Sequence, residues 1–260
     1  MNIEEEINSL RKFIKTGIMV LSTFLLLTIC TYLIPTEITV SNSSSGKELP
    51  IYCVDRTDKK VALTFDAAWE NDDTKDILDI LKKHDVKVTF FMTGGWIEKY
   101  PEDVKAFAAA GHDLGNHSEN HKNMSQLSKE ECIEEIMKPH EKVKKLTGKE
   151  MKLFRPPYGD YNNTVIRAAR DSGYDTIQWD VDSLDWKDYG VDSIINTVLG
   201  NKHLGNGSII LCHNGAKYTK DALESLIIGL QEKGYEIVPV SELIHTGDYY
   251  MDHEGRQFKK

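Results

Sequence analysis

Two histidines of the chain, His117 and His121, lie four residues apart in a polar stretch without apolar periodicity. Neutral imidazoles are common ligands of divalent metal ions, and a pair at this spacing can bind one ion if the backbone between them makes a turn. A loop with solvated imidazoles would have the same sequence, in a chain that contains nine histidines. The pair therefore indicates a metal site only where other reactive side chains accompany it.

Reactive side chains occur at several further points, and each follows a short apolar run. Asp66 comes after residues 61–65, and His213 comes after residues 208–212. Such runs are typical of buried strands, and the carboxyl ends of parallel strands meet at one mouth, where catalytic residues collect. Polar groups at several such strand ends indicate an active site rather than solvated loops. The remaining polar segments are residues 117–121, 155–159 and 182–186.

From Lys60 onward the chain alternates between β-type apolar runs and amphipathic helical segments. A capping box opens one helix at Ser128, and Pro139 predicts a bend in that helix. About seven strand–helix units predict an α/β fold whose parallel sheet closes, or nearly closes, into a barrel. The predicted strands are 61–65, 86–92, 112–114, 153–154, 174–179, 208–212 and 236–240, and the predicted helices are 74–84, 101–110, 128–146, 163–171, 191–199 and 220–233.

The N-terminal region contains an uncharged apolar run, residues 17–34, which is just long enough to span a bilayer core of about 30 Å as a helix. Basic residues precede it within residues 1–16, which favours a cytoplasmic N-terminus and an extracytoplasmic domain. A cleavable signal peptide is the alternative, but no small-x-small site follows the run, so we expect an uncleaved single-pass anchor in the cell membrane. Residues 35–57, with a Ser-rich stretch, are then a linker.

Composition limits the classes of function. Hydrophobic residues make up 40% of the 260, enough for a sizeable core, and the net charge of −9 argues against nucleic-acid binding. Four cysteines without regular spacing indicate neither a zinc knuckle nor a disulfide framework, and a single bridge from Cys53 to Cys132 or Cys212 is the one pairing left open. We expect a monomer.

The polar segments have specific sequences. They are Thr64-Phe65-Asp66, His117-Ser118-Glu119-Asn120-His121, Arg155-Pro156-Pro157-Tyr158-Gly159, Asp182-Ser183-Leu184-Asp185-Trp186 and Ile210-Leu211-Cys212-His213. In this order they resemble the five motifs of the polysaccharide deacetylases with the NodB homology domain, carbohydrate esterase family 4. The resemblance covers residues 58–245, which leaves residues 246–260 as a C-terminal tail.

This resemblance implies a distorted (β/α)7 barrel. It also implies metal-dependent removal of acetyl groups from polysaccharides, commonly from the N-acetylglucosamine of peptidoglycan or chitin and sometimes from the O-acetyl groups of xylan. A membrane anchor joined to one such domain is most similar to bacterial sporulation-type and cell-wall deacetylases. We therefore expect an acetylated cell-wall polysaccharide as the substrate.

Amide hydrolysis needs an activated water, a stabilised oxyanion and a proton for the leaving amine. The resemblance implies that Asp66 is the base that takes the proton of the water and that His213 is the acid that protonates the departing nitrogen. Arg155 would orient Asp66, and Asp185 would pair with His213 and keep it protonated.

The resemblance also implies the ligands. His117 and His121 would bind the metal ion, with zinc as the expected ion and cobalt or another divalent ion as alternatives. The ion would lower the pKa of the attacking water and polarise the acetyl carbonyl. Tyr158, Trp186 and Trp69 would offer flat apolar faces to a sugar ring.

One position departs from the family pattern. Most members have a second aspartate directly after the catalytic one, and it is the third protein ligand of the metal, but here that position is Ala67. The missing oxygen would come from a differently folded loop, and Asp72 or Asp73 is a better candidate than Glu70. The alternative is that both aspartates serve as caps of the helix that follows.

This departure keeps two further functions open. The chain is expected to be an N-deacetylase, because it retains both the base and the acid. An O-acetyl polysaccharide esterase would use the same catalytic residues. A carbohydrate-binding domain with impaired catalysis would follow if the substitution at Ala67 weakens the metal site.

Overall fold

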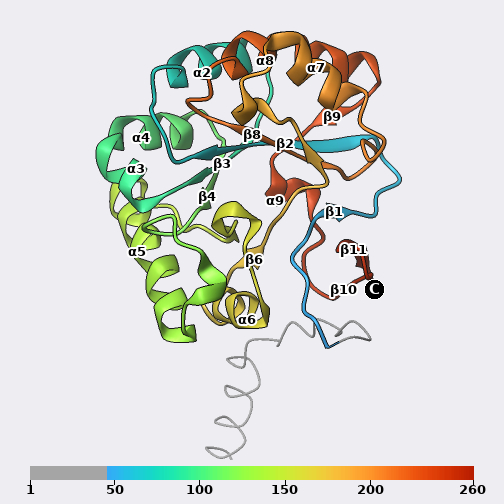
Figure 1. The fold of residues 1–260 in the computed structure, drawn as a ribbon. Helices are drawn as coiled ribbons and strands as arrows, with labels where there is room; N and C mark the ends of the chain where they lie inside the picture. The colour runs from blue at the N-terminus through green and yellow to red at the C-terminus, as the bar shows by residue number, and fades with distance from the viewer. Residues whose placement is uncertain (1–45) are drawn as a thin grey trace, which may run out of the picture. The chain divides into compact units, whose positions relative to one another are not determined.

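The computed structural model describes residues 46–260, which form a curled parallel sheet with helices on its outer face (Figure 1). The predicted anchor at residues 17–34 lies outside the described residues, as do residues 1–16 and residues 35–45 of the linker predicted at residues 35–57. Within residues 46–260, every helix is too short or too polar to span a bilayer.

The large sheet of the described region has eight strands, and every strand pair in it is parallel. Their order is β6-β5-β4-β3-β2-β8-β7, and β9 pairs with β2. A curled parallel sheet with helices outside it confirms the predicted α/β fold and fits the distorted barrel of the NodB type. The strands are β2 (Lys60–Ala67), β3 (Thr89–Met92), β4 (Asp113–Asn116), β5 (Leu153–Phe154), β6 (Asp175–Thr176), β7 (Val181–Asp182), β8 (Ile209–His213) and β9 (Glu236–Ile237).

The helices follow the strands in sequence, and the six that the sequence predicts are all present. Helix α5 begins with the predicted capping box, in which the backbone N–H of Glu131 donates to Ser128 Oγ at 3.2 Å and the backbone N–H of Ser128 donates to Glu131 Oε2 at 2.8 Å. The sequence did not predict helix α3, because its two leading glycines weaken any helical pattern. The helices are α2 (Thr74–Lys83), α3 (Gly94–Lys99), α4 (Pro101–Ala109), α5 (Lys129–Thr147), α6 (Asn163–Asp171), α7 (Val191–Leu199), α8 (Thr219–Glu232) and α9 (Val240–Leu243).

Residues on both sides of the predicted 58–245 domain belong to the folded unit. Strand β1 (Cys53–Val54) pairs with β11 (Arg256–Lys259), which is antiparallel to β10 (Tyr249–Met251). Ile51 also bridges to Ile177 beside the edge strand β6. Apolar side chains of these segments are buried in the inner core, so residues expected as linker and tail are held by the hydrophobic effect.

The core has two layers, and strand β2 explains how they arise. Side chains alternate between the faces of a strand. Val61, Leu63 and Phe65 pack in the layer that includes side chains of the helices, whereas Ala62 packs in the inner layer. The same alternation turns Asp66, at the carboxyl end of β2, toward the mouth of the barrel.

Candidate active site

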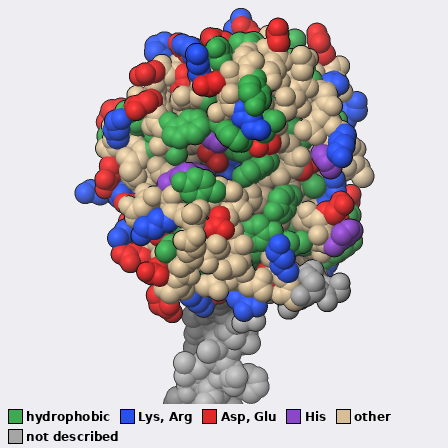
Figure 2. All heavy atoms as spheres, in the orientation of Figure 1, with side chains coloured by type: hydrophobic (Ala, Val, Ile, Leu, Met, Phe, Trp, Pro, Cys, Tyr) green, Lys and Arg blue, Asp and Glu red, His purple; other side chains and the backbone are tan. Residues whose placement is uncertain are grey.

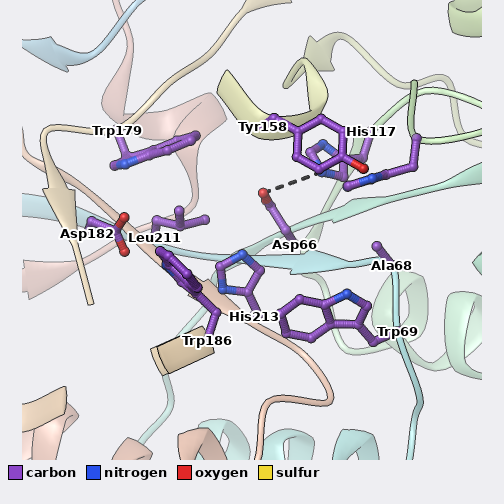
Figure 3. A pocket seen from close by; sticks show the side chains of 11 residues that line it. Asp66, Ala68, Trp69, His117, Tyr158, Trp179, Asp182, Trp186, Leu211 and His213 are labelled. Carbon is purple, nitrogen blue, oxygen red and sulfur yellow. Dashed lines mark ion pairs between the residues drawn. The ribbon is translucent and has the colours of Figure 1, made fainter. Parts of the chain in front are cut away.

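A cavity of about 590 Å³ opens at the carboxyl ends of the strands, and seven of the eleven site residues that the sequence predicts line it (Figure 3). The space-filling view shows a hollow in which carboxylate and histidine side chains lie below a rim of hydrophobic ones (Figure 2). The lining residues are Asp66, Ala68, Trp69, His117, His121, Tyr158, Trp179, Asp182, Trp186, Leu211 and His213.

Asp66 is held by the fully buried guanidinium of Arg155, whose Nη1 donates to Asp66 Oδ1 at 2.7 Å. The same Nη1 donates to Thr64 Oγ1 at 2.9 Å, and Nη2 donates to the carbonyl of Gln178 at 3.2 Å. Burial alone would raise the pKa of Asp66, but the positive charge of Arg155 holds that pKa below its usual value. Asp66 is therefore an ionised carboxylate with a fixed orientation, as predicted for a base.

The two histidines are presented by a turn at the end of β4. His117 Nδ1 lies 2.7 Å from the backbone carbonyl oxygen of Arg155, which assigns the proton to Nδ1 and leaves the lone pair of Nε2 free. Nε2 is 3.5 Å from Asp66 Oδ2. The chain reverses through Ser118 and His121, with φ angles of 66° and 54°, and this places the two imidazole rings 5.0 Å apart.

Both imidazoles are in the neutral form that binds metal ions. Burial lowers the pKa of His117 to about 4 and also lowers the pKa of His121, because the charged form loses its hydration. Asn116 fixes the turn, since its Oδ1 accepts from the N–H of Ser118 at 3.0 Å and its Nδ2 donates to the carbonyl of Ile136 at 2.7 Å. Sequence reasoning missed Asn116, although its position directly before His117 is a local signal.

His213 and Asp185 form the second charged pair. His213 Nδ1 lies 2.7 Å from Asp185 Oδ1, and the backbone N–H of His213 donates to Asp185 Oδ2 at 2.7 Å. Thr219 Oγ1 donates to the same Oδ2 at 2.7 Å. Burial alone would lower the pKa of His213, but its hydrogen bond to Asp185 and the charge of that carboxylate raise it. His213 is thus favoured in its protonated form, as an acid requires.

The three predicted aromatic residues frame the cavity. Trp69 stacks on His213 with ring centroids 4.9 Å apart and an angle of 18° between the planes, while Tyr158 packs edge-on against His121 at 4.5 Å. Tyr158, Trp186 and Trp69 are 67%, 49% and 45% exposed, so their apolar surfaces face solvent at the mouth (Figure 3). Exposed rings at a cavity mouth suit the apolar faces of sugars.

The structure does not bring Asp72 or Asp73 to the cavity. Asp73 accepts instead from Asn214 Nδ2 and, at 2.9 Å, from the backbone N–H of Gly215, so its carboxylate braces the loop after β8. Asp72 is exposed, and the methyl group of Ala67 is buried in the outer core. The prediction that one of the two aspartates replaces the missing ligand therefore has no support in the geometry.

The side chains at the site provide only part of the ligand set that a divalent ion needs. Two neutral imidazoles converge, and the Asp66 carboxylate is close to one of them, but residues 46–260 contain no cluster of three or more Cys, His, Asp or Glu side chains suited to a metal ion. His117 and His121 would hold an ion there with one protein ligand fewer than the three usual in catalytic zinc sites.

Comparisons with known proteins identify the family. Residues 54–177 match the family model described as polysaccharide deacetylase. A peptidoglycan-N-acetylglucosamine deacetylase of Bacillus cereus is 38% identical over 191 residues, which are 72% of this chain and 69% of the relative. The peptidoglycan-N-acetylmuramic acid deacetylase PdaA of Bacillus subtilis is 33% identical over 212 residues, which are 78% of this chain and 78% of the relative.

Solved structures agree. A pseudoenzyme of carbohydrate esterase family 4 from Bacillus anthracis superposes with a TM-score of 0.72 at 34% identity, over 78% of this chain and 73% of that one. A mutant described as the same pseudoenzyme with restored enzymatic activity superposes with a TM-score of 0.71 at 37% identity, over 75% of this chain and 70% of that one.

The fold and the site thus define a hydrolase of the type that acts on acetylated polysaccharides. The chain belongs to the polysaccharide deacetylase family, carbohydrate esterase family 4. This confirms both the resemblance found in the sequence and the predicted class of enzyme, a hydrolase acting on carbon–nitrogen bonds other than peptide bonds.

Zinc binding tests which residues hold the metal. Isothermal titration of zinc into the protein is expected to give one site, which His121→Ala abolishes because the ion would then keep a single histidine ligand. Asp73→Asn is expected to leave the zinc affinity unchanged, since Asn214 and Gly215 already occupy its oxygens. A loss of zinc binding in Asp73→Asn would contradict the geometry, and Asp72→Asn is the exposed control.

The His213–Asp185 pair predicts a pH effect. The pKa of His213 is raised in the native protein, so Asp185→Asn is expected to lower it, and the alkaline limb of kcat/KM is expected to move to lower pH because the acid loses its proton earlier. NMR titration of the imidazole gives the pKa directly. Glu224→Gln removes a carboxylate 2.8 Å from the remote His84 and serves as the matched control. An unchanged His213 pKa in Asp185→Asn would contradict the assignment.

Proposed function

We propose that this chain removes the acetyl group from N-acetylated sugars of the cell wall, with peptidoglycan as the substrate ahead of a chitin-like glycan. One observation carries the proposal: Asp66 and His213 are register partners on the adjacent parallel strands β2 and β8. Both side chains line the same cavity, and each has its own buried partner, Arg155 or Asp185. A base and an acid are therefore fixed side by side over one reaction site.

The chain's own residues perform the proton transfers. Asp66, kept ionised by Arg155, would accept a proton from the attacking water, and the guanidinium restricts the carboxylate to one orientation. His213, kept protonated by Asp185, would donate a proton to the sugar nitrogen as the carbon–nitrogen bond breaks. The opposite pKa shifts of the two groups separate their roles.

We infer that a divalent ion, zinc in the first place and cobalt or another ion as the alternative, is held by His117 and His121. When bound, such an ion would lower the pKa of the water and polarise the acetyl carbonyl. The Nδ1 hydrogen bond of His117 to the backbone of Arg155 aligns its ring for this role. Because the set of protein ligands is incomplete, we expect the ion to bind more weakly than in relatives that have a third protein ligand.

Two alternatives share this geometry. An O-acetyl polysaccharide esterase would use the same base, and its leaving oxygen would need less help from His213. Two observations support a carbohydrate-binding domain with impaired catalysis: the alanine at Ala67 and the similarity to a structure that is described as a pseudoenzyme. The retained pairs of Asp66 with Arg155 and of His213 with Asp185 favour the N-deacetylase, because binding alone requires neither.

We also propose that residues 17–34 anchor the protein in the cell membrane, with the catalytic domain outside the cytoplasm. We further propose that the protein is a monomer. The full chain is expected to remain with the membrane fraction after a salt wash, and protease added to intact spheroplasts is expected to digest the domain. Recovery of a shortened chain in the medium would indicate a cleaved signal peptide instead.

Acetate release tests the activity. The full chain with zinc or cobalt is expected to release acetate from peptidoglycan and from N-acetylglucosamine oligomers, and chelator is expected to stop the release. Asp66→Asn and His213→Ala are each expected to lower kcat by a factor of about 10² to 10⁴, because each removes a proton-transfer group. Circular dichroism of both variants controls for folding.

The outcomes separate the three functions. Release from O-acetylated xylan alone would indicate the esterase. No release from any glycan, together with retained glycan binding, would indicate the binding domain.

A further inference from the structure

The described part of the chain begins with a segment that precedes the family domain. Residues 46–52, the strap, belong to the linker that the sequence predicts, and the family model matches residues 54–177. The strap nevertheless lies along helix α6 and strand β6 before the chain reaches β1 (Figure 1). The family resemblance assigns it no function, so its role follows from its own contacts.

Glu48 attaches the strap to α6. Its carboxylate accepts from Arg167 Nε at 2.6 Å and from Arg170 Nη2, and the residue is only 5% exposed. Burial alone would raise the pKa of Glu48, but its hydrogen bonds with the two arginines lower it, so the carboxylate stays ionised. Asn163 adds two bonds, since its Oδ1 accepts from the N–H of Glu48 at 2.9 Å and its Nδ2 donates to the carbonyl of Gly46 at 2.8 Å. These contacts hold the strap on the first turns of the helix.

The strap also contacts the loop that carries Tyr158. This motif loop, residues 155–162, connects β5 to α6. The hydroxyl of Tyr52 donates to that of Tyr161 at 3.2 Å, and Lys47 Nζ lies 5.2 Å from the centre of the Tyr161 ring. The strap therefore contacts the loop three residues beyond the aromatic ring at the cavity mouth.

The motif loop needs support because the backbone of Tyr158 is unfavourable. Its φ angle is 61°, in the left-handed region, which a bulky side chain rarely adopts and which persists only where surrounding contacts hold it. Ser125 supplies part of the support, since its N–H donates to Asp160 Oδ2 at 2.9 Å and its carbonyl accepts from Asn162 Nδ2 at 3.0 Å. The contacts of the strap with the next residues complete the support between Tyr158 and α6.

A third contact connects the strap to the sheet. The backbone N–H of Ile51 donates to the carbonyl of Thr176 at 2.8 Å, and its carbonyl accepts from the N–H of Gln178 at 2.7 Å, so the strap extends the sheet beside β6. The carbonyl of Gln178 in turn accepts from Arg155 Nη2 at 3.2 Å. Since these are backbone bonds of the strap, a change of another strap side chain leaves the support of Arg155 in place.

We propose that the strap positions the motif loop for the sugar, with Glu48 and Tyr52 as its positioning residues. The inference rests on the proposed function, because it assumes that a sugar ring binds against Tyr158 at the cavity mouth. Neither positioning residue lines the reaction cavity, so both act through the loop and not on the reacting atoms. When the strap loosens, Tyr158 leaves its left-handed conformation more often, and the sugar loses a fixed apolar surface.

Two variants of the full chain in detergent test the strap. Glu48→Gln removes the charge between the two arginines, and Tyr52→Phe removes only the hydroxyl that donates to Tyr161. Each is expected to raise KM for the tetramer of N-acetylglucosamine about three- to tenfold, the effect typical of one lost hydrogen bond. We expect kcat to be unchanged, because the loosened ring contributes to binding whereas the base and the acid keep their own partners.

Hydrogen exchange reports on the loop in the absence of any reaction. The N–H of Gly159 donates to the carbonyl of Pro156 at 3.2 Å, and that of Asp160 donates to the carbonyl of Pro157 at 2.9 Å. Both amides are expected to exchange about tenfold faster in each variant, because a loosened loop opens more often. The amide of Gly234, at the end of α8, is expected to keep its native rate.

Glu224→Gln is the matched control. Glu224 also has two partners, because its Oε1 lies 2.5 Å from Lys83 Nζ and 2.8 Å from His84 Nε2, but these contacts join α8 to the end of α2, away from the motif loop (Figure 1). This variant is expected to keep the native KM and the native exchange rates of the loop. If Glu48→Gln does not fold, Tyr52→Phe decides the test, since it keeps the ring and the charge of the strap.

Three results would overturn the proposal. One is a motif loop that exchanges at the native rate in the strap variants. The others are faster exchange with an unchanged KM, and a fall in kcat at the native KM, because each would show that the strap does not position the loop for the sugar.

The outcomes also separate the strap from the proposed function. If the native chain releases no acetate, calorimetry with the tetramer gives Kd in place of KM. A raised Kd with faster exchange in the strap variants then supports the strap while the hydrolysis fails, and an unchanged Kd overturns the strap as well. If acetate is released and both variants keep the native KM and exchange rates, the hydrolysis stands and the strap proposal is wrong.

Discussion

The buried guanidinium of Arg155 is the group on which the rest of the site depends. Its side chain fixes the carboxylate of Asp66, and its backbone carbonyl accepts from the imidazole of His117, so one residue orients both the proposed base and a proposed metal ligand. Burying an unpaired guanidinium would be costly, and removing one partner of such a buried pair costs about 3 to 5 kcal/mol. The strands therefore have to place Asp66 and Arg155 together for the barrel interior to be stable.

Around this pair the protein favours opposite charge states in two neighbouring groups. Arg155 lowers the pKa of Asp66 and favours its ionised form, whereas Asp185 raises the pKa of His213 and favours its protonated form. The parallel pairing of β2 with β8 makes Asp66 and His213 direct neighbours. When two adjacent groups have different environments, one site can provide both a base and an acid near neutral pH.

The proposed metal site is the part of this arrangement in which the chain differs from the family pattern. The imidazoles of His117 and His121 are neutral and converge, but Ala67 has no oxygen to offer, and Asp73 is committed to the loop after β8. The rings of Tyr158, Trp186 and Trp69 give the mouth of the reaction cavity an exposed apolar rim.

The sequence by itself determined the strand–helix alternation and the order of the five motifs, because both depend on local pattern and residue type, and the motifs supplied the candidate catalytic residues. Only the tertiary structure decided that Asp73 bonds to Asn214 and that Thr219 supports Asp185. It also brought strands β1 and β11 together from the two sides of the predicted domain. These contacts join residues far apart in the chain, and such pairings leave no local periodicity, because they arise only when the elements pack.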